Sequence, residues 1–259
     1  MSWQRKAGAV IVALVALAAV VSLVWTPYDP LQTEVAARLQ GSSPAHWMGT
    51  DQFGRDIASR VMDGARLTLT VAVGAVGLSG LIGVPLGIWA GMRRGASRVV
   101  MAGADLLLAF PALLLAIVFT AVFGASIWIV VLAIGIAGIP AFVRVARAGT
   151  MQVMQRDYIL AARIAKVSGP AIAWRHVLPN IWPLVLTQVS VAVALAILAE
   201  AGLSFLGLGA PAPYASWGRM LQASQPYLAT SPHLALWPGA AIALTVLGFN
   251  LLGNADDRR

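Results

Sequence analysis

The chain has 259 residues, of which 59% are hydrophobic and 11% charged, and its formal net charge is +8. A soluble domain carries about 25% charged residues, so this composition excludes a water-soluble globular protein and indicates an integral membrane protein. The absence of cysteine excludes disulfides, thiol catalysis and cysteine-ligated metals. We interpret the positive charge as a topology signal and expect no nucleic-acid partner.

Long, continuous apolar runs predict an all-α membrane protein with six transmembrane helices, since a barrel would need short alternating strands. The predicted spans are residues 7–25, 67–91, 99–123, 127–143, 182–206 and 235–253. Together they predict a single transmembrane domain over residues 1–259. The first run follows Arg5 and Lys6 as a signal peptide would, but its apolar core is too long, so we expect a retained helix.

Six spans place both termini on the same side of the membrane. Of the 18 Lys and Arg residues, 13 lie on that side and 5 on the other, with Arg258 and Arg259 among the former. The positive-inside rule therefore predicts that both termini and the loop 144–181 are cytoplasmic, and that the segments 26–66 and 207–234 lie outside.

The cytoplasmic loop has helical periodicity, which a simple linker does not need. Tyr158 and three alanines recur at helical spacing on one face: Ala161, Ala162 and Ala165. Gly169–Pro170 then breaks the helix, and a second helix is predicted over 170–177, ending at Leu178 because that residue precedes a proline. Two interpretations remain open from these residues: a basic segment lying on anionic membrane lipid, or a docking surface for another protein.

Several motifs, in a conserved order along the chain, resemble those of ABC importer permeases. Tyr158–Arg163 together with His176–Asn180 resembles the EAA loop of these permeases. The other segments resemble the dipeptide/oligopeptide/nickel permease family, in its C-type subunit: 46–56, 83–87, 199–209, 211–218 and 248–253. This resemblance covers nearly the whole chain.

The resemblance implies a type I ABC importer permease fold with a cytoplasmic coupling helix, in a bacterial cytoplasmic (inner) membrane. It implies half of a translocation pathway for di- or oligopeptides, with nickel or a metal chelate as the alternative cargo. The implied partners are a second, B-type permease subunit, two ATP-binding subunits and an extracytoplasmic substrate-binding protein. The residues that it assigns to ATPase coupling are Tyr158, Ala161, Ala162, Arg163, Lys166, His176 and Pro179.

The loop departs from the family pattern at two positions. Leu160 replaces the usual Glu, and Lys166 replaces the usual Gly, with Gly169 three residues later. We therefore expect the bend of the loop to be displaced towards Gly169.

No ATP site is expected in this chain. A Walker A motif needs Gly-Lys-[Ser/Thr], and the only lysines, Lys6 and Lys166, follow Arg5 and Ala165. The chain is therefore predicted not to be an enzyme and to hold no cofactor, with ATP and Mg on the partner ATPases.

Charged residues near the spans have two interpretations each. Glu200 either lines or gates the pathway, or lies near the interface and hydrogen-bonds or pairs with the partner permease. Asp51, Arg55 and Asp56 either contact a partner or binding protein, or form a local turn network in which Asp51 caps a helix over 52–66.

Asp105 is expected to pair with a base such as Arg98 or Arg144. The histidines 46, 176 and 233 are far apart and show no metal-ligand spacing, so no metal site is expected. A stand-alone secondary transporter and an intramembrane enzyme are the other classes considered. The spans offer neither a broken-helix site rich in charge nor a nucleophile with its base.

Overall fold

The computed structural model describes residues 3–209, 211 and 213–253, and over these residues the chain is all α-helical, as predicted. The predicted tail 254–259 lies outside the described residues. The helices are α1 (Trp3–Val21), α2 (Ile57–Met92), α3 (Arg94–Leu108), α4 (Ala112–Phe123), α5 (Ile127–Val153), α6 (Asp157–Ile164), α7 (Gly169–Ile172), α8 (Leu178–Phe205), α9 (Trp217–Ser224) and α10 (His233–Gly253). Short 3-10 turns occur at Val35–Ala37 and Gln225–Tyr227, and a π turn at Ala173–Val177.

Five helical segments of the described chain are long and apolar enough to cross a membrane: Trp3–Val21, Ile57–Met92, Ile127–Val153, Gly169–Phe205 and His233–Gly253. The predicted span 99–123 differs, because it consists of α3 and α4 with an angle of 78° between them. Pro111 explains the break. It has no N–H group, and it disfavours helical backbone at Phe110 before it.

The fifth span begins earlier than predicted, and the predicted helix end at Leu178 was wrong. Helical structure runs from Gly169 to Phe205 without interruption. The π turn makes this continuity possible: the Leu178 N–H bonds to the carbonyl of Ala173, five residues back. Pro179 then falls in the first turn of α8, where a missing N–H group is tolerated.

The core is centred on α2 and α5, whose backbones approach closely along a stripe of glycines. A Cβ atom at Gly83 would lie 2.6 Å from the Cβ of Phe142, and one at Gly87 would lie 2.6 Å from the carbonyl oxygen of Val143. Small residues at i and i+4 are a common means of close helix packing in membranes. The segment 83–87 is therefore one part of the contact surface between these two helices.

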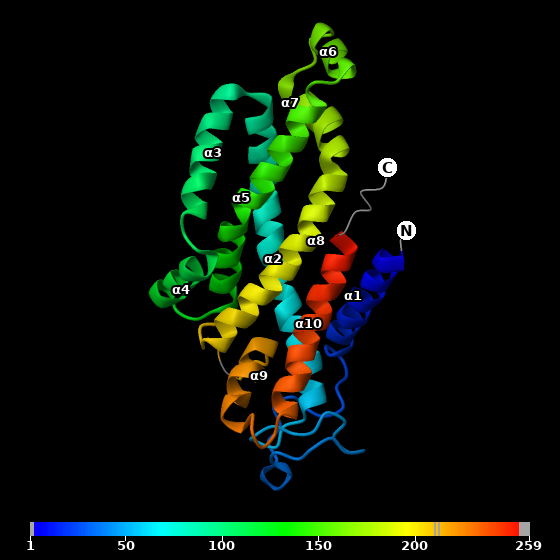
Figure 1. The fold of residues 1–259 in the computed structure, drawn as a ribbon, viewed down its shortest axis with the longest axis vertical. Helices are drawn as coiled ribbons and strands as arrows, with labels where there is room; N and C mark the ends of the chain where they lie inside the picture. The colour runs from blue at the N-terminus through cyan, green and yellow to red at the C-terminus, as the bar shows by residue number, and fades with distance from the viewer. Residues whose placement is uncertain (1–2, 210, 212, 254–259) are drawn as a thin grey trace.

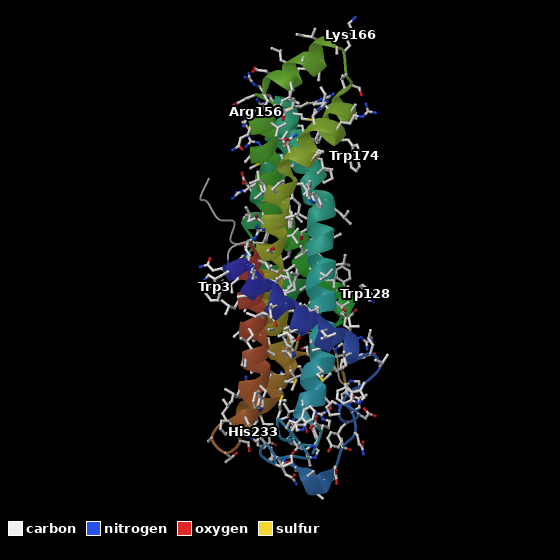
Figure 2. The ribbon with its side chains drawn as sticks, turned by 90° about the vertical axis from the view of Figure 1, so that its right-hand side faces the viewer. Trp3, Trp128, Arg156, Lys166, Trp174 and His233 are labelled. Carbon is white, nitrogen blue, oxygen red and sulfur yellow. The ribbon has the colours of Figure 1, made fainter. Side chains whose placement is uncertain are left out.

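The molecule is elongated, and its two ends differ (Figure 1). The short helix α6 occupies one extreme, and the segment 26–56 with α9 occupies the other. α1 contacts α10 and crosses it obliquely in the half nearer to the segment 26–56, and α2, α5 and α8 continue beyond them towards α6. Figure 2 shows the same separation, with Lys166 near one end and His233 near the other.

Candidate functional site

The candidate site is the segment 156–182, at the end of the molecule formed by α6. Helix α6 begins after Arg156, which has extended backbone, and carries Asp157 in its first turn and Arg163 in its last. Both charges have the sign that the helix dipole favours at their positions. These local preferences allow eight residues to form a separate helix between α5 and α7.

The structure divides the predicted small-residue face of α6. Ala162 is only 9% exposed and packs with the fully buried Ile159 against the rest of the chain. Tyr158 and Ala161 are exposed and available to a partner. The prediction of one continuous docking face therefore needs correction, because burial of Ile159 turns Ala162 inward with it.

The outward surface of α6 is apolar and basic. Leu160 is 59% exposed and Ile164 is 76% exposed. Arg163 and Lys166 are exposed beside them. Large apolar side chains exposed next to one another on a short, partly charged helix are typical of an interaction surface.

Lys166 forms the bend that follows α6, so the expected displacement of the bend towards Gly169 was wrong. Its φ angle is +56°, and Gly169 is not among the glycines with positive φ. The Lys166 N–H donates to the carbonyl of Arg163 (3.0 Å), and the Val167 N–H donates to that of Ala162 (3.0 Å). These two bonds define a Schellman motif, whose left-handed position is usually a glycine.

The second arm of the loop folds back on α6. The rings of Tyr158 and His176 have centroids 6.2 Å apart, which brings two of the predicted coupling residues together. The Asn180 side-chain amide donates to the carbonyl of His176 (2.6 Å). Pro179 is exposed at the start of α8.

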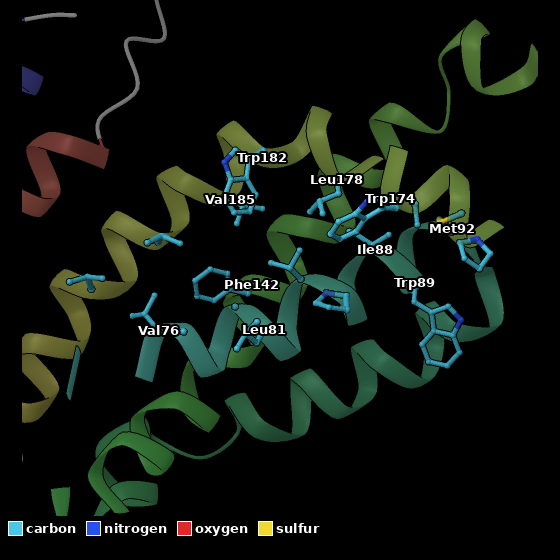
Figure 3. A pocket seen from close by; sticks show the side chains of 18 of the residues that line it. Val76, Leu81, Ile88, Trp89, Met92, Phe142, Trp174, Leu178, Trp182 and Val185 are labelled. Carbon is cyan, nitrogen blue, oxygen red and sulfur yellow. The ribbon is translucent and has the colours of Figure 1, made fainter. Parts of the chain in front are cut away.

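A cavity of about 950 Å³ lies beside this arm, between α2, α5, α7 and α8 (Figure 3). Its lining is mainly apolar and includes three tryptophans, Trp89, Trp174 and Trp182, with Arg93 as its charged residue. The sequence analysis did not identify this cavity, because the three tryptophans belong to different helical elements and share no spacing pattern along the chain. Pro170 and Trp174 of the loop line the cavity together with Trp182. The loop itself therefore forms part of the cavity wall.

Two arginines in the second half of α5 contact α3. Arg144 pairs with Asp105 at 2.7 Å, which confirms the pairing expected for Asp105. The Arg147 Nε donates to the hydroxyl of Ser97 (2.8 Å). Both contacts hold α3 against α5.

At the opposite end, Asp51, Arg55 and Asp56 form a local network. The Asp51 carboxylate accepts from the backbone N–H groups of Phe53 and Arg55 and from the Arg55 Nε at 2.7 Å. Asp51 and Asp56 are 6% and 3% exposed, so they face inward. The turn-network interpretation is therefore the one that the contacts support.

The predicted helix over 52–66 begins later than expected, at Ile57, and its cap is Asp56 rather than Asp51. The Asp56 carboxylate accepts from the N–H group of Ser59 (2.8 Å) and contacts the Nδ1 of His46 (3.0 Å). The reason is that Asp51 is already used in its own turn, which Gly54 closes with a φ angle of +78°.

Glu200 is 1% exposed in α8 and is absent from the cavity lining. Its carboxylate accepts from Thr68 of α2 and from Ser204 of its own helix. Among the described residues, no group of three His, Cys, Asp or Glu side chains is arranged to hold a metal ion.

Comparison with known proteins agrees with the sequence resemblance. The family model described as "Binding-protein-dependent transport system inner membrane component" matches residues 83–255. The chain is 41% identical over 230 residues to the glutathione transport system permease protein GsiD of Pectobacterium atrosepticum, covering 88% of this chain and 76% of the relative. It is 38% identical over 248 residues to the dipeptide transport system permease protein DppC of Alkalihalophilus pseudofirmus, covering 95% and 82%.

A solved structure, the crystal structure of an amino acid ABC transporter, superposes with a TM-score of 0.55 at 17% identity. The match covers 75% of this chain and 91% of that chain. At this identity the likeness concerns the fold alone.

Proposed function

Since the chain belongs to the family of inner membrane components of binding-protein-dependent transport systems, and is thus a permease of an ABC importer, we propose that its cargo is a short peptide. The relatives named above transport glutathione or dipeptides. The mainly apolar cavity agrees with such a cargo, because an apolar lining with a single charged residue accepts peptides with different side chains. Its volume of about 950 Å³ lies within the usual range for ligand clefts.

The segment 156–182 is the proposed site at which the two ATP-binding subunits dock. The single observation that carries this proposal is the exposed apolar and basic surface of α6, at the extreme end of the molecule. Figure 1 shows α6 well beyond the ends of α1 and α10, and therefore away from the slab that these two helices would cross. This position favours a protein partner over lipid headgroups.

The proposed transmission of force uses the second arm of the loop. Gly169 and Trp174 lie on the uninterrupted helical segment that continues into the fifth span, and they also line the cavity. A displacement of the loop by an ATPase would therefore change the cavity wall directly. Closing and reopening of the ATPase dimer would in this way alternate the access of the pathway.

The remaining parts of the proposal concern topology and partners. Both termini and α6 would be cytoplasmic, and the end with the segment 26–56 and α9 would receive the substrate-binding protein. A second permease subunit would complete the pathway. ATP and Mg would bind to the ATPases, since this chain has no Walker A lysine and needs no cofactor of its own.

Co-purification tests the docking site. Because Ala161 is exposed and Ala162 is buried, Ala161→Arg changes the outer surface of α6 without filling its core contact. We expect this variant to assemble with the second permease but to lose the ATPases. The matched control is Gln225→Arg, an exposed position at the other end of the molecule. Retention of both ATPases by Ala161→Arg would contradict docking at α6.

Uptake into proteoliposomes tests the cargo. The complete complex and its binding protein are supplied with labelled di- and tripeptides, and in parallel with nickel ions. We expect ATP-dependent uptake of peptide. Transport of nickel without transport of any peptide would overturn the proposed cargo. It would not affect the docking proposal, which the co-purification experiment tests separately.

A further inference from the structure

Glu200 is a buried acidic residue that neither the cavity nor the loop uses. Its partners form the Glu200 cluster, defined as Glu200, Thr68, Ser204 and Ser216. The Thr68 hydroxyl donates to one carboxylate oxygen (3.2 Å) and the Ser204 hydroxyl to the other (2.6 Å). The Ser216 side chain lies close to the same carboxyl group. All four residues are at most 2% exposed.

The cluster joins three helices that are far apart in the sequence. Thr68 belongs to α2, Glu200 and Ser204 belong to α8, and Ser216 is the N-cap of α9. Ser216 has two functions, since its oxygen also accepts the N–H group of Arg219 (3.2 Å). Glu200 therefore lies next to the residue that starts α9.

Packing around the cluster makes the same connection. The Trp217 Nε1 donates to the carbonyl of Val61 in α2 (2.9 Å), and the Trp217 side chain is 1% exposed. Gly218 lies against the backbone of Ala201 in α8, with no room for a Cβ atom. The first two residues of α9 are thus fixed to α2 on one side and to α8 on the other.

We propose that Glu200 is a positioning residue of the transport cycle, which fixes α9 to α2 and α8 at the outer end of the pathway. The inference rests on the proposed function, in which α8 moves with the ATPases and α9 lies at the end that receives the binding protein. Through Glu200, a movement of α8 displaces α9 at the same time. The docking surface for the binding protein and the pathway helices then change position together.

The first test measures coupling in the complete reconstituted complex. The quantity is the ratio of ATPase activity with loaded binding protein to basal ATPase activity. We expect Glu200→Ala to lower this ratio about ten-fold, because the buried hydroxyls of Thr68 and Ser204 lose their acceptor and Ser216 loses its polar neighbour. Glu200→Gln keeps the shape of the side chain and one acceptor oxygen. Its amide group can also donate to a neighbouring hydroxyl. This variant should therefore retain at least about half of the wild-type ratio.

Glu34→Ala is the matched control, since Glu34 is the other glutamate of the chain and is exposed at the same end. A wild-type ratio in Glu200→Ala overturns the inference while leaving the proposed function intact. Absence of any stimulation in the wild-type complex overturns the proposed function instead.

A second measurement does not depend on activity. Because the chain has no cysteine, Arg66→Cys in α2 and Gln225→Cys after α9 can carry a pair of spin labels, and both positions are exposed. We expect one narrow distance distribution in the otherwise wild-type chain and in Glu200→Gln. The distribution should broaden in Glu200→Ala and in the milder Ser216→Ala. An unchanged distribution in Glu200→Ala would show that α9 is held without Glu200 and would overturn the inference.

Discussion

Replacing Lys166 with glycine should stabilise the end of α6. Lys166 has a φ angle of +56°, in the left-handed region, where a residue with a Cβ atom is disfavoured by about 1–2 kcal/mol. Glycine removes this strain, but it also gives the unfolded chain more freedom, which offsets about 0.4–1 kcal/mol of the gain. The net expectation is a stabilisation of about 0.5–1 kcal/mol, or a factor of about 2–5 in the local opening equilibrium.

Hydrogen exchange followed by mass spectrometry measures this opening in the peptide that covers residues 157–168. Both Schellman hydrogen bonds, from Lys166 and Val167, close the end of this helix, so their amides report directly on it. We expect exchange of these amides to slow by about 2–5-fold in Lys166→Gly.

Two controls separate backbone strain from charge and from glycine content. Lys166→Ala removes the charge and keeps the Cβ atom, so it should give no comparable protection. Gly169→Ala should cause no loss, because a Cβ atom at Gly169 would meet nothing within 4 Å and its φ angle is not positive. Equal protection in Lys166→Ala and Lys166→Gly would refute the argument from backbone strain and assign the effect to charge.

Two further predictions concern stability, measured as thermal unfolding of the purified permease by tryptophan fluorescence. Gly87→Ala should destabilise the permease by about 1–3 kcal/mol, because the new methyl group would collide with the α5 backbone. Gly77→Ala in the same helix is the control. It should have no such effect, because a Cβ atom at Gly77 would meet nothing within 4 Å. Asp56→Ala should cost about 2–3 kcal/mol, since it removes the α2 cap and leaves buried His46 and Ser59 groups unpaired. Its matched control is Glu34→Ala on the same segment. Equal effects at Gly87 and Gly77, or at Asp56 and Glu34, would contradict the packing and capping arguments.

The class of fold was predictable from the sequence because apolar runs of this length have few other solutions in a bilayer. The pairing of Asp105 with Arg144 was also predictable, because a lone acid beside a basic loop requires a partner. The broken span 99–123 was less evident, although Pro111 was a local signal for it. The continuation of helix through Pro179 was not predictable from local rules, since it depends on a π turn that tertiary packing selects.

Within the candidate site, side-chain spacing predicted a helix but not its orientation. Ala161 and Ala162 are both small, and only the burial of Ile159 decides which of them faces the core. Likewise, composition at the bend favoured Gly169, whereas the hydrogen bonds at the end of α6 select Lys166. Contacts between distant segments, such as Thr68 with Glu200, have no signature in one sequence.

The uninterrupted helical segment Gly169–Phe205 has the properties of a lever. It contains 37 residues, and at 1.5 Å per residue it is about 55 Å long. A tilt of about 5° around one end displaces the other end by about 5 Å, which is close to one helical turn. Because no loop interrupts this segment, a small angular change at α7 during the proposed transport cycle would produce a large linear displacement beside Glu200.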